Sequence, residues 1–172
     1  MTVGFLMLCH TALDRAAQVA RYWASHDCPV VIHVDKRVPT AEVTKLTADL
    51  ADLENIRFSE RHACEWGTWG IVGATQAASL VMLKEFPGVR HVFLASGSCL
   101  PLRPVEELKA YLDERPRTDF IESVTTADVG WTVGGLDYER FTLRFPFSWR
   151  KQRPLFDSYV WLQRKLGVRR KL

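Results

Sequence analysis

Short, continuous runs of apolar residues recur along the chain and predict buried β-strands. Val3–Cys9 is such a run, and its lack of polar positions is typical of a central strand that is covered on both faces. Similar runs follow, and each of them ends in small or polar residues. The predicted strands cover residues 3–9, 29–34, 55–58, 90–95 and 118–122.

Between these runs, apolar residues recur every three or four positions, which predicts amphipathic helices. Thr11 is in position to cap the first helix, and Pro87-Gly88 ends the clearest one. The predicted helices cover residues 12–25, 39–50, 71–86, 104–113 and 155–166. Leu155, Tyr159, Leu162 and Leu166 mark the apolar side of the last helix, whose outer face is basic.

The alternation of strand and helix predicts an α/β fold with a Rossmann-like, mostly parallel sheet flanked by helices. We expect a single domain over residues 1–172, with the sheet core at 1–123. Residues 124–172 then form a loop and the basic amphipathic helix. Within that part, residues 129–149 contain Gly134-Gly135 and several aromatics, which predicts irregular loop or short antiparallel strands.

The composition is that of an ordinary globular protein, with 47% hydrophobic and 25% charged residues. The net charge of +3 arises at the end of the chain, because residues 150–172 carry eight basic side chains and one acidic one. This charge lies on one predicted helix with little aromatic interleaving, so we expect a solvated face and no nucleic-acid partner. Peripheral contact of that helix with an anionic membrane is the less favoured alternative.

The four cysteines form no Cys-x-x-Cys pair and no cluster at zinc spacing. Three of them lie in or beside apolar runs, which favours free, buried thiols in a reducing compartment. The first predicted strand begins at Val3 and leaves no room for a signal peptide, and no apolar run approaches membrane-spanning length. We therefore expect a cytoplasmic protein without a transmembrane segment.

The loops after the first four predicted strands open on one edge of the sheet, where open α/β proteins bind their ligands. These loops contain His10, Asp35, Glu65, Trp66, Trp69, Ser96, Ser98 and Cys99. Asp35 can accept hydrogen bonds from a ribose or a base edge, and a tryptophan can stack on a ring. Small residues after the fourth strand let a ligand approach the backbone. With no GxGxxG or P-loop motif in the sequence, the pattern favours a nucleoside site without a phosphate-binding glycine loop.

Each candidate also has a purely structural interpretation. His10, at a strand end, can cap a neighbouring backbone group, and at least one of Trp66 and Trp69 is expected to anchor the core. Cys99 is expected to be a small packed residue rather than a nucleophile, because no base is identifiable beside it. Asp35 has the stronger functional case, since an acidic residue directly after a buried strand is poorly placed for packing.

Four segments carry a resemblance to a known family. They are Phe5–His10 (FLMLCH), Ile32–Lys36 (IHVDK), Trp66–Ala74 (WGTWGIVGA) and Leu94–Leu102 (LASGSCLPL). In this order and spacing they resemble the core-2/I-branching β-1,6-N-acetylglucosaminyltransferase family, which includes the peptide O-xylosyltransferases. The chain is most similar to the N-terminal portion of a bacterial-type member. The resemblance covers about residues 3–123 and is less specific around Arg140.

The resemblance implies a GT-A type sheet and an inverting transfer from a UDP-sugar, such as UDP-GlcNAc or UDP-xylose, to the hydroxyl of a glycan or other acceptor. It also implies the roles of individual residues. Those that bind the nucleotide sugar are His10, Asp35, Trp66, Ser98 and Cys99. Those on the acceptor side are Trp131, Glu139 and Arg140.

The resemblance further implies a metal-independent mechanism with no cofactor beside the donor. The sequence agrees, because it contains no Asp-x-Asp motif and has Cys99 where the family usually has an acidic residue. Without a metal, the diphosphate leaving group needs cationic side chains. The family supplies these, and its catalytic glutamate, downstream of the acceptor loop. We expect this chain, which ends at Leu172, to lack that region, and the general base remains unassigned.

Three functional classes follow from these observations. The chain is either the donor-binding part of a longer transferase or a shortened relative without turnover. Alternatively, it is a module that binds a nucleotide sugar without catalysis. The third class is an unrelated doubly wound domain that binds another nucleotide.

Overall fold

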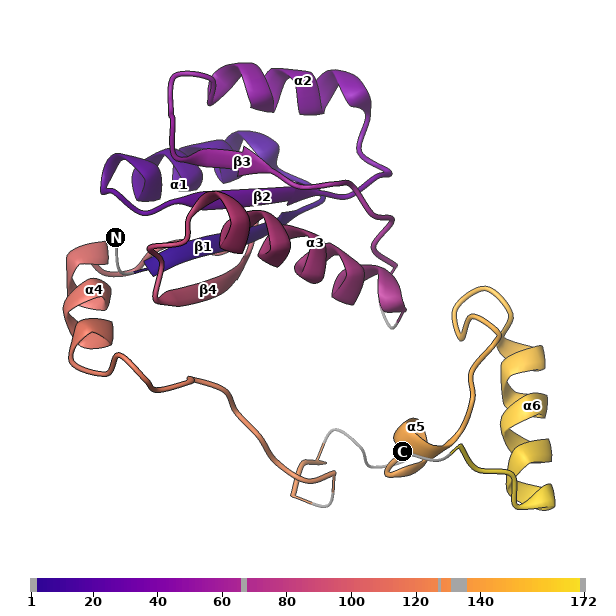
Figure 1. The fold of residues 1–172 in the computed structure, drawn as a ribbon. Helices are drawn as coiled ribbons and strands as arrows, with labels where there is room; N and C mark the ends of the chain where they lie inside the picture. The colour runs from indigo at the N-terminus through magenta and orange to yellow at the C-terminus, as the bar shows by residue number, and fades with distance from the viewer. Residues whose placement is uncertain (1–2, 66–67, 127, 131–135, 171–172) are drawn as a thin grey trace. The chain divides into compact units, whose positions relative to one another are not determined.

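The computed structural model describes residues 3–65, 68–126, 128–130 and 136–170 (Figure 1). The chain forms two compact units, Met1–Thr118 and Asp119–Leu172. Strands and helices alternate through the first unit, whereas the described part of the second unit contains helices and irregular segments. The candidate donor-binding residues belong to the first unit and the candidate acceptor-side residues to the second.

The first unit is built on a parallel sheet. Its strands are β1 (Val3–Cys9), β2 (Val30–Val34), β3 (Ile56–Phe58) and β4 (His91–Ser96). They lie in the order β3-β2-β1-β4, and each neighbouring pair is parallel. The predicted α/β fold with a mostly parallel sheet is therefore confirmed, and these strands begin and end within a residue of their predicted bounds.

Helices cover both faces of this sheet (Figure 1). On one face lie α1 (Leu13–Ser25), α2 (Thr40–Asp49) and α4 (Val105–Asp113), and on the other lies α3 (Trp69–Glu85). Side chains alternate along a strand, so Phe5 and Met7 of β1 face the first layer while Leu6 faces α3. A strand buried on both faces needs apolar residues at every position, which explains the continuous runs in the sequence.

The two cores differ in how closely the helices approach. On the larger side the ring of Trp23 stacks on that of Phe5, with centroids 4.0 Å apart. On the other side, Ala78 and Met82 of α3 pack against Leu6. A Cβ atom at Gly4 would lie 2.8 Å from the Met82 sulfur, so β1 has a glycine where α3 comes closest. Small residues thus let α3 lie directly on the sheet.

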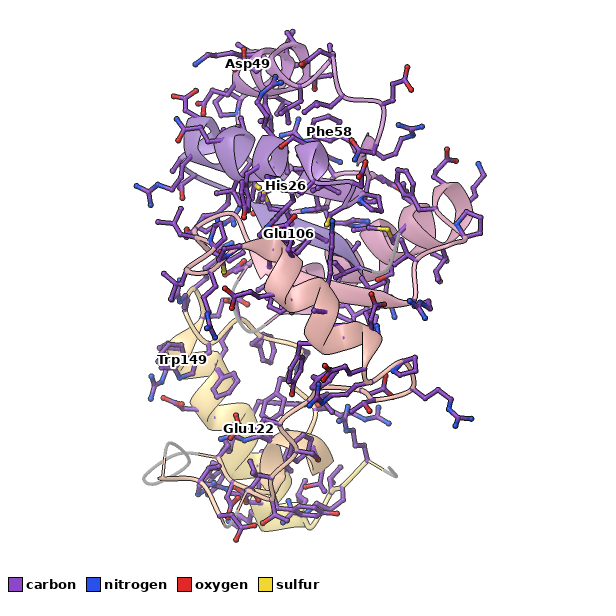
Figure 2. The ribbon with its side chains drawn as sticks, turned by 90° about the vertical axis from the view of Figure 1, so that its left-hand side faces the viewer. His26, Asp49, Phe58, Glu106, Glu122 and Trp149 are labelled. Carbon is purple, nitrogen blue, oxygen red and sulfur yellow. The ribbon has the colours of Figure 1, made fainter. Side chains whose placement is uncertain are left out.

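Helix α4 is attached to the end of α1. The Tyr22 hydroxyl accepts a hydrogen bond from the Val105 amide at 3.1 Å, and the Lys109 ammonium donates to the His26 carbonyl. His26 and Glu106, which mark the two elements, are labelled in Figure 2. These bonds fix the segment that follows β4 onto the sheet layer.

The start of α1 differs from the prediction that Thr11 caps it. The N-cap residue is Ala12, which has a left-handed conformation (φ 50°) and makes no side-chain capping bond. Its carbonyl instead accepts hydrogen bonds from the amides of Arg15 (3.0 Å) and Ala16 (3.1 Å). The capping pattern was wrong because the turn after β1 places Thr11 one position too early.

The predicted fifth strand at residues 118–122 is also wrong. These residues form no strand, and Phe120 and Ile121 are exposed. Among the described residues β4 is the edge of the sheet, and its Val92 and Leu94 side chains stay about half exposed. An apolar run forms a strand only where a neighbour pairs with it, and the local pattern says nothing about that neighbour.

In the second unit, α5 (Glu139–Thr142) precedes α6 (Arg153–Leu166). The buried side chain of Gln163 holds α6 to the chain before it: its Oε1 accepts from the Arg144 amide at 3.0 Å, and its Nε2 donates to the Arg144 carbonyl at 2.9 Å. The rings of Phe145 and Phe156 stack beside this contact at 5.4 Å. Both polar groups of the glutamine are therefore satisfied by backbone.

The apolar side expected of α6 is not the side that is buried. Leu155, Leu162 and Leu166 are exposed, whereas Val160 and Gln163 are buried. The helix itself is predicted correctly to within two residues, but a hydrogen-bonding glutamine, which a hydrophobic pattern cannot detect, sets its orientation. Of the helices that the structure describes, none is long and apolar enough to cross a membrane.

The packing of α2 yields a stability prediction. Leu46 of α2 is 2% exposed, and Leu83 of α3 is 66% exposed. Leu46→Ala should lower the free energy of unfolding by about 2–5 kcal/mol, because it leaves a cavity in the core. Leu83→Ala, with the same change in helix propensity, should cost less than about 0.5 kcal/mol. Urea unfolding followed by far-UV circular dichroism measures both, and equal losses would contradict the assigned core face.

Candidate functional site

The strand order creates a switch point between β1 and β4. The chain adds β2 and β3 on one side of β1 and then returns to add β4 on the other side. In open α/β sheets the ligand binds in the crevice outside the carboxyl ends of the two strands at this point. Because Leu8 pairs with Ser96, the loops that begin with His10 and with Gly97 start side by side.

The loop after β4 is held close to β1 by a glycine. The Gly97 amide donates to the Leu8 carbonyl at 2.8 Å. A Cβ atom at this position would lie 2.8 Å from Cys9 Sγ, closer than side chains tolerate, so a larger residue would push the loop away. Ser98 and Cys99 follow and are exposed. Cys99 was expected to pack inside, and that expectation is wrong because the turn carries it outward.

The four cysteines of the first unit differ in burial. All four are free thiols. Burial raises the pKa of the Cys9 thiol to about 12, and burial also raises the pKa of Cys28 and of the half-buried Cys64. These three groups are therefore protonated at neutral pH and are poor nucleophiles. The expectation of free, buried thiols is confirmed for Cys9 and Cys28.

Asp35 follows β2 and is 1% exposed. Its Oδ1 accepts from the Arg37 amide at 2.8 Å, and its Oδ2 accepts from Arg37 Nη2 at 2.6 Å and from the Cys64 amide at 3.1 Å. The bonds from Arg37, above all, hold the pKa of Asp35 well below its usual range despite the burial. The carboxylate is therefore ionised at neutral pH.

This shift in the pKa of Asp35 has a consequence for stability. Because the folded pKa lies below the unfolded one, the ionised carboxylate stabilises the fold fully above about pH 4, and this contribution is lost as the pH falls towards the lowered pKa. The geometry makes Asp35 an anchor for its own turn and for the loop that contains Cys64. Its contact with a uridine stays a prediction.

The loop between β3 and α3 lies along the turn after β2. The Lys36 amide donates to the His62 carbonyl at 2.9 Å. The Arg61 guanidinium donates to the carbonyls of Asp35 at 2.9 Å and Val38 at 2.5 Å. These bonds fix residues 61 and 62, in the first half of the loop between β3 and α3.

Helix α3 begins directly against this loop. The Thr68 hydroxyl caps the helix by accepting from the Gly70 amide at 3.3 Å. A Cβ atom at Gly70 would lie only 2.1 Å from the Ala63 carbonyl oxygen. At Gly73, one turn later, the nearest atoms would lie at 3.7 Å, which is ordinary contact. A glycine is therefore required at residue 70, where the helix packs on the loop.

Two cationic side chains at this edge, those of Arg37 and Arg61, are already engaged. The Arg37 side chain is 60% exposed, but it forms an ion pair with the buried Asp35 carboxylate at 2.6 Å. Arg61 is bound to backbone carbonyls. Among the described residues, no group of three or more His, Cys, Asp or Glu side chains is arranged to hold a metal ion.

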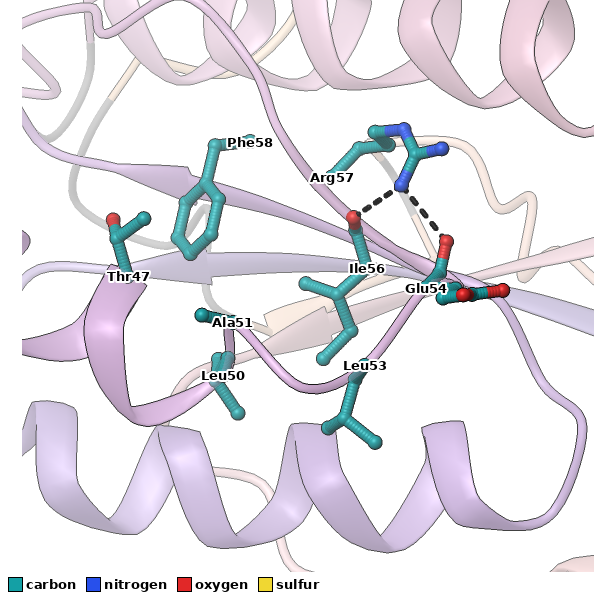
Figure 3. Close-up of a pocket in the computed structure, with 8 residues that line it drawn as sticks. All are labelled: Thr47, Leu50, Ala51, Leu53, Glu54, Ile56, Arg57 and Phe58. Carbon is teal, nitrogen blue, oxygen red and sulfur yellow. Dashed lines mark hydrogen bonds between the residues drawn. The ribbon is translucent and has the colours of Figure 1, made fainter.

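A cavity of about 550 Å³ lies elsewhere in the first unit, where the end of α2 faces β3 (Figure 3). Its lining residues are Thr47, Leu50, Ala51, Leu53, Glu54, Ile56, Arg57 and Phe58. Arg57 Nη1 donates to the carbonyls of Glu54 and Ile56, at 2.9 and 2.8 Å. The lining contains none of the predicted site residues.

Comparison with protein families identifies the chain. The model of the Core-2/I-Branching enzyme family matches residues 3–143. The chain belongs to this family. The match spans all four segments that carry the resemblance in the sequence, and the family comprises glycosyltransferases. No curated protein matches the chain.

In this branching-enzyme family member, the predicted donor residues lie at the ends of neighbouring strands. His10 follows β1, Asp35 follows β2, and Ser98 and Cys99 follow β4. His10 is exposed at the switch point, as a ligand contact requires. Trp66 lies outside the described residues.

Trp69 was the alternative aromatic residue at this edge. It is the first residue of α3 and is 68% exposed, so it is not the core anchor that one of the two tryptophans was expected to be. The exposed indole is available as a flat surface beside the loop. Whether Trp66 packs in the core is not described.

The acceptor-side candidates of the branching-enzyme family member lie in the second unit. Glu139 forms an ion pair with Arg164 of α6, whose Nε donates at 2.9 Å, and this pairing lowers the pKa of Glu139. Arg140 Nε donates to the Leu136 carbonyl at 3.0 Å. Trp131 lies outside the described residues. The two described residues thus hold their own unit together, and their contact with an acceptor stays a prediction.

Sequence reasoning missed two residues that hold this edge together: His33, which binds the His62 amide, and Arg37, which binds Asp35. His33 is a polar residue inside an otherwise apolar strand, which is a signal that a buried polar group has a specific partner. Arg37 follows Asp35 by two positions, a spacing that allows a short turn to be closed by an ion pair. Their partners lie in the loop after β3, far along the chain, and the local sequence pattern does not indicate them.

The close packing of α3 on the loop yields a second prediction. Gly70→Ala should lower the free energy of unfolding by about 1–3 kcal/mol, because the new methyl group collides with the Ala63 carbonyl. Gly73→Ala, in the same helix, should raise it by up to about 1 kcal/mol through helix propensity. Urea unfolding measures both variants. A Gly70→Ala protein as stable as the unmodified chain would show that α3 does not pack on the loop as described.

Proposed function

We propose that this chain supplies the donor-binding part of an inverting, metal-independent glycosyltransferase that uses a UDP-sugar. The observation that carries the proposal is the switch point between β1 and β4, where the Gly97 loop lies against β1. A nucleotide sugar needs close approach to the backbone and polar groups from several loops. Small residues after β4 and exposed His10 after β1 meet both needs.

The proposed uridine contacts are His10, Asp35 and Trp66. The ends of β1 and β2 are adjacent in the sheet, which supports a shared role for His10 and Asp35. The exposed indole of Trp69 offers a second aromatic surface on the same loop. Ser98 and Cys99 are proposed to lie beside the sugar-diphosphate.

The proposal assigns no metal to the donor site. Divalent ions that bind nucleotide phosphates are held mainly by carboxylate oxygens, whereas the sequence has no Asp-x-Asp motif and has a thiol at Cys99. Cationic side chains must then neutralise the diphosphate. Asp35 already neutralises Arg37, so we propose that other basic residues, which lie downstream of the acceptor segment in the family pattern, complete this task.

The proposed donor is UDP-GlcNAc or UDP-xylose, and the proposed acceptor is a hydroxyl of a glycan or similar compound. Inverting transfer needs a general base for that hydroxyl. Glu139 is the carboxylate of the proposed acceptor segment, but the ion pair with Arg164 lowers its pKa and makes it a weak base. This observation favours the second candidate function, a module that binds a nucleotide sugar without catalysis.

Calorimetric titration of the full chain with UDP tests the proposal. We expect binding with the same Kd in EDTA and in magnesium, and weaker binding of other nucleoside diphosphates. Absence of UDP binding would reject both candidate functions. Hydrolysis or transfer of UDP-GlcNAc or UDP-xylose then separates the enzyme from the module, and we expect the chain alone to show little of either.

A substitution tests the assigned residues. Asp35→Ala should weaken UDP binding by about tenfold or more, equivalent to about 1.4 kcal/mol, because it removes a proposed uridine contact and an anchor of the loop. Glu42→Ala, at an exposed carboxylate in the first turn of α2, is the matched control and should leave the Kd unchanged. Similar losses in both variants would refute the assigned site.

A further inference from the structure

His33 is a buried histidine in the middle of an apolar strand. It lies in β2 beside Leu8 of β1 and is 1% exposed. Its Nε2 accepts a hydrogen bond from the backbone amide of His62 at 2.9 Å, and the two imidazole rings stack with centroids 5.9 Å apart. The residue therefore connects the sheet to the loop between β3 and α3.

His33 acts together with Asp35, two positions along the chain. The amide of His62 donates to His33, and the amide of Cys64, two positions along the loop, donates to Asp35 at 3.1 Å. The Lys36 amide donates back to the His62 carbonyl at 2.9 Å. The side chains of residues 33 and 35 thus accept hydrogen bonds from the amides of residues 62 and 64. In a regular sheet, backbone carbonyls of a neighbouring strand would accept these hydrogen bonds.

This geometry determines the tautomer of His33. A ring nitrogen that accepts an amide hydrogen carries no proton, so the proton of the neutral imidazole is on Nδ1. Nδ1 is buried and has no hydrogen-bond partner among the described residues. A protonated imidazole would present two donors and no acceptor, and it would lose its bond to the loop.

We propose that His33 is a positioning residue of the nucleotide-sugar site: its neutral imidazole, with the proton on Nδ1, holds residues 62–64 in the conformation that binds the donor. This inference rests on the proposed function, because the loop leads directly to Trp66. Protonation of His33 releases the His62 amide and weakens nucleotide binding. The residue acts through the loop and does not itself touch the nucleotide.

The groups that face His33 favour its neutral form. Burial, followed by the neighbouring His62, lowers the pKa of His33 below its ordinary value, and Arg61 acts in the same direction. Asp35 raises the pKa but is outweighed. β1 contributes the uncharged Leu8, and no residue from Trp69 to Thr75 in α3 is charged. The imidazole is therefore neutral at pH 7.

The tautomer is tested without any ligand. In the full chain labelled with ¹⁵N-histidine, the imidazole signals that disappear in His33→Gln should belong to a ring with the proton on Nδ1. His26, whose Nδ1 donates to the Tyr22 carbonyl at 2.7 Å, should give a second such ring that the substitution leaves in place. In the same protein the His62 amide should exchange slowly with solvent, and His33→Leu should speed this exchange. If the ring that is lost in His33→Gln carries its proton on Nε2, or if the exchange is unaffected by His33→Leu, the proposed bond is overturned.

The positioning role is tested by UDP titration of three variants. His33→Leu removes the acceptor and should weaken UDP binding by about tenfold. His33→Gln keeps an acceptor oxygen within reach of the His62 amide and should bind UDP within about threefold of the unmodified chain. His91→Leu, at the opposite end of the sheet in β4, is the matched control and should leave the Kd unchanged.

The pH profile separates positioning from general stability. As the pH falls from about 7.5 through the lowered pKa of His33, the Kd of the unmodified chain should rise more than that of His33→Gln, which cannot titrate. The terminal phosphate of UDP titrates near pH 6, but this effect cancels in the comparison. Parallel profiles would overturn the proposal. This comparison uses only the unmodified chain and His33→Gln, so it can be made even if His33→Leu does not fold.

The outcomes distinguish this inference from the proposed function. If the unmodified chain binds no UDP, the proposed function fails, and the role of His33 in a nucleotide site fails with it. The amide exchange and the tautomer then still decide whether His33 holds the loop. If UDP binds, but His33→Leu leaves the Kd unchanged and the pH profiles are parallel, the proposed function stands and the positioning role is rejected.

Discussion

Burial of β1 and β2 between two layers of helices is the constraint on which the rest of the first unit depends. Strands covered on both faces cannot place polar side chains towards water along their length. Polar chemistry is therefore confined to the carboxyl ends, where the chain leaves the sheet. The strand order adds a switch point between β1 and β4, so His10 and the Ser98-Cys99 turn meet the solvent at one edge of the sheet.

Two buried polar residues of the first unit, His33 and Asp35, illustrate how burial and hydrogen bonding compete. For Asp35 the donors from Arg37 and Cys64 outweigh burial, so the pKa falls and the group is charged. For His33 burial is the largest effect, so the pKa falls and the group is neutral. Both shifts favour the form that accepts a hydrogen bond. In each case an amide of the loop between β3 and α3 is one of the donors.

The sequence predicts the strands and helices of the first unit well, because neighbouring residues along the chain carry the pattern that specifies each element. Continuous apolar runs and helical periodicity reveal the four strands and the helices from α1 to α4, since two-sided burial leaves a mark at every position. The failures are the places where a partner decides the outcome. Residues 118–122 have the composition of a strand but no paired neighbour among the described residues, and Gln163 orients α6 through hydrogen bonds to Arg144.

The same distinction applies to the candidate site. The positions of His10, Asp35, Ser98 and Cys99 follow from strand ends and are predictable, whereas the surroundings of Asp35 are not. His33 and Asp35 bind amides 29 residues away, and no local pattern encodes such a pair. The exposure of Cys99 depends on a turn that Gly97 holds against Cys9. Trp66 and Trp131 lie outside the described residues.

A loop held by two side chains behaves differently from one held by a strand. A backbone ladder distributes its hydrogen bonds over many residues and tolerates most substitutions, whereas here one imidazole and one carboxylate supply the acceptors for His62 and Cys64. A loop that is already ordered in the folded protein does not have to lose conformational entropy when the nucleotide binds. If the proposed function holds, donor affinity depends on the protonation state of His33, a buried residue that contacts this loop without touching the donor.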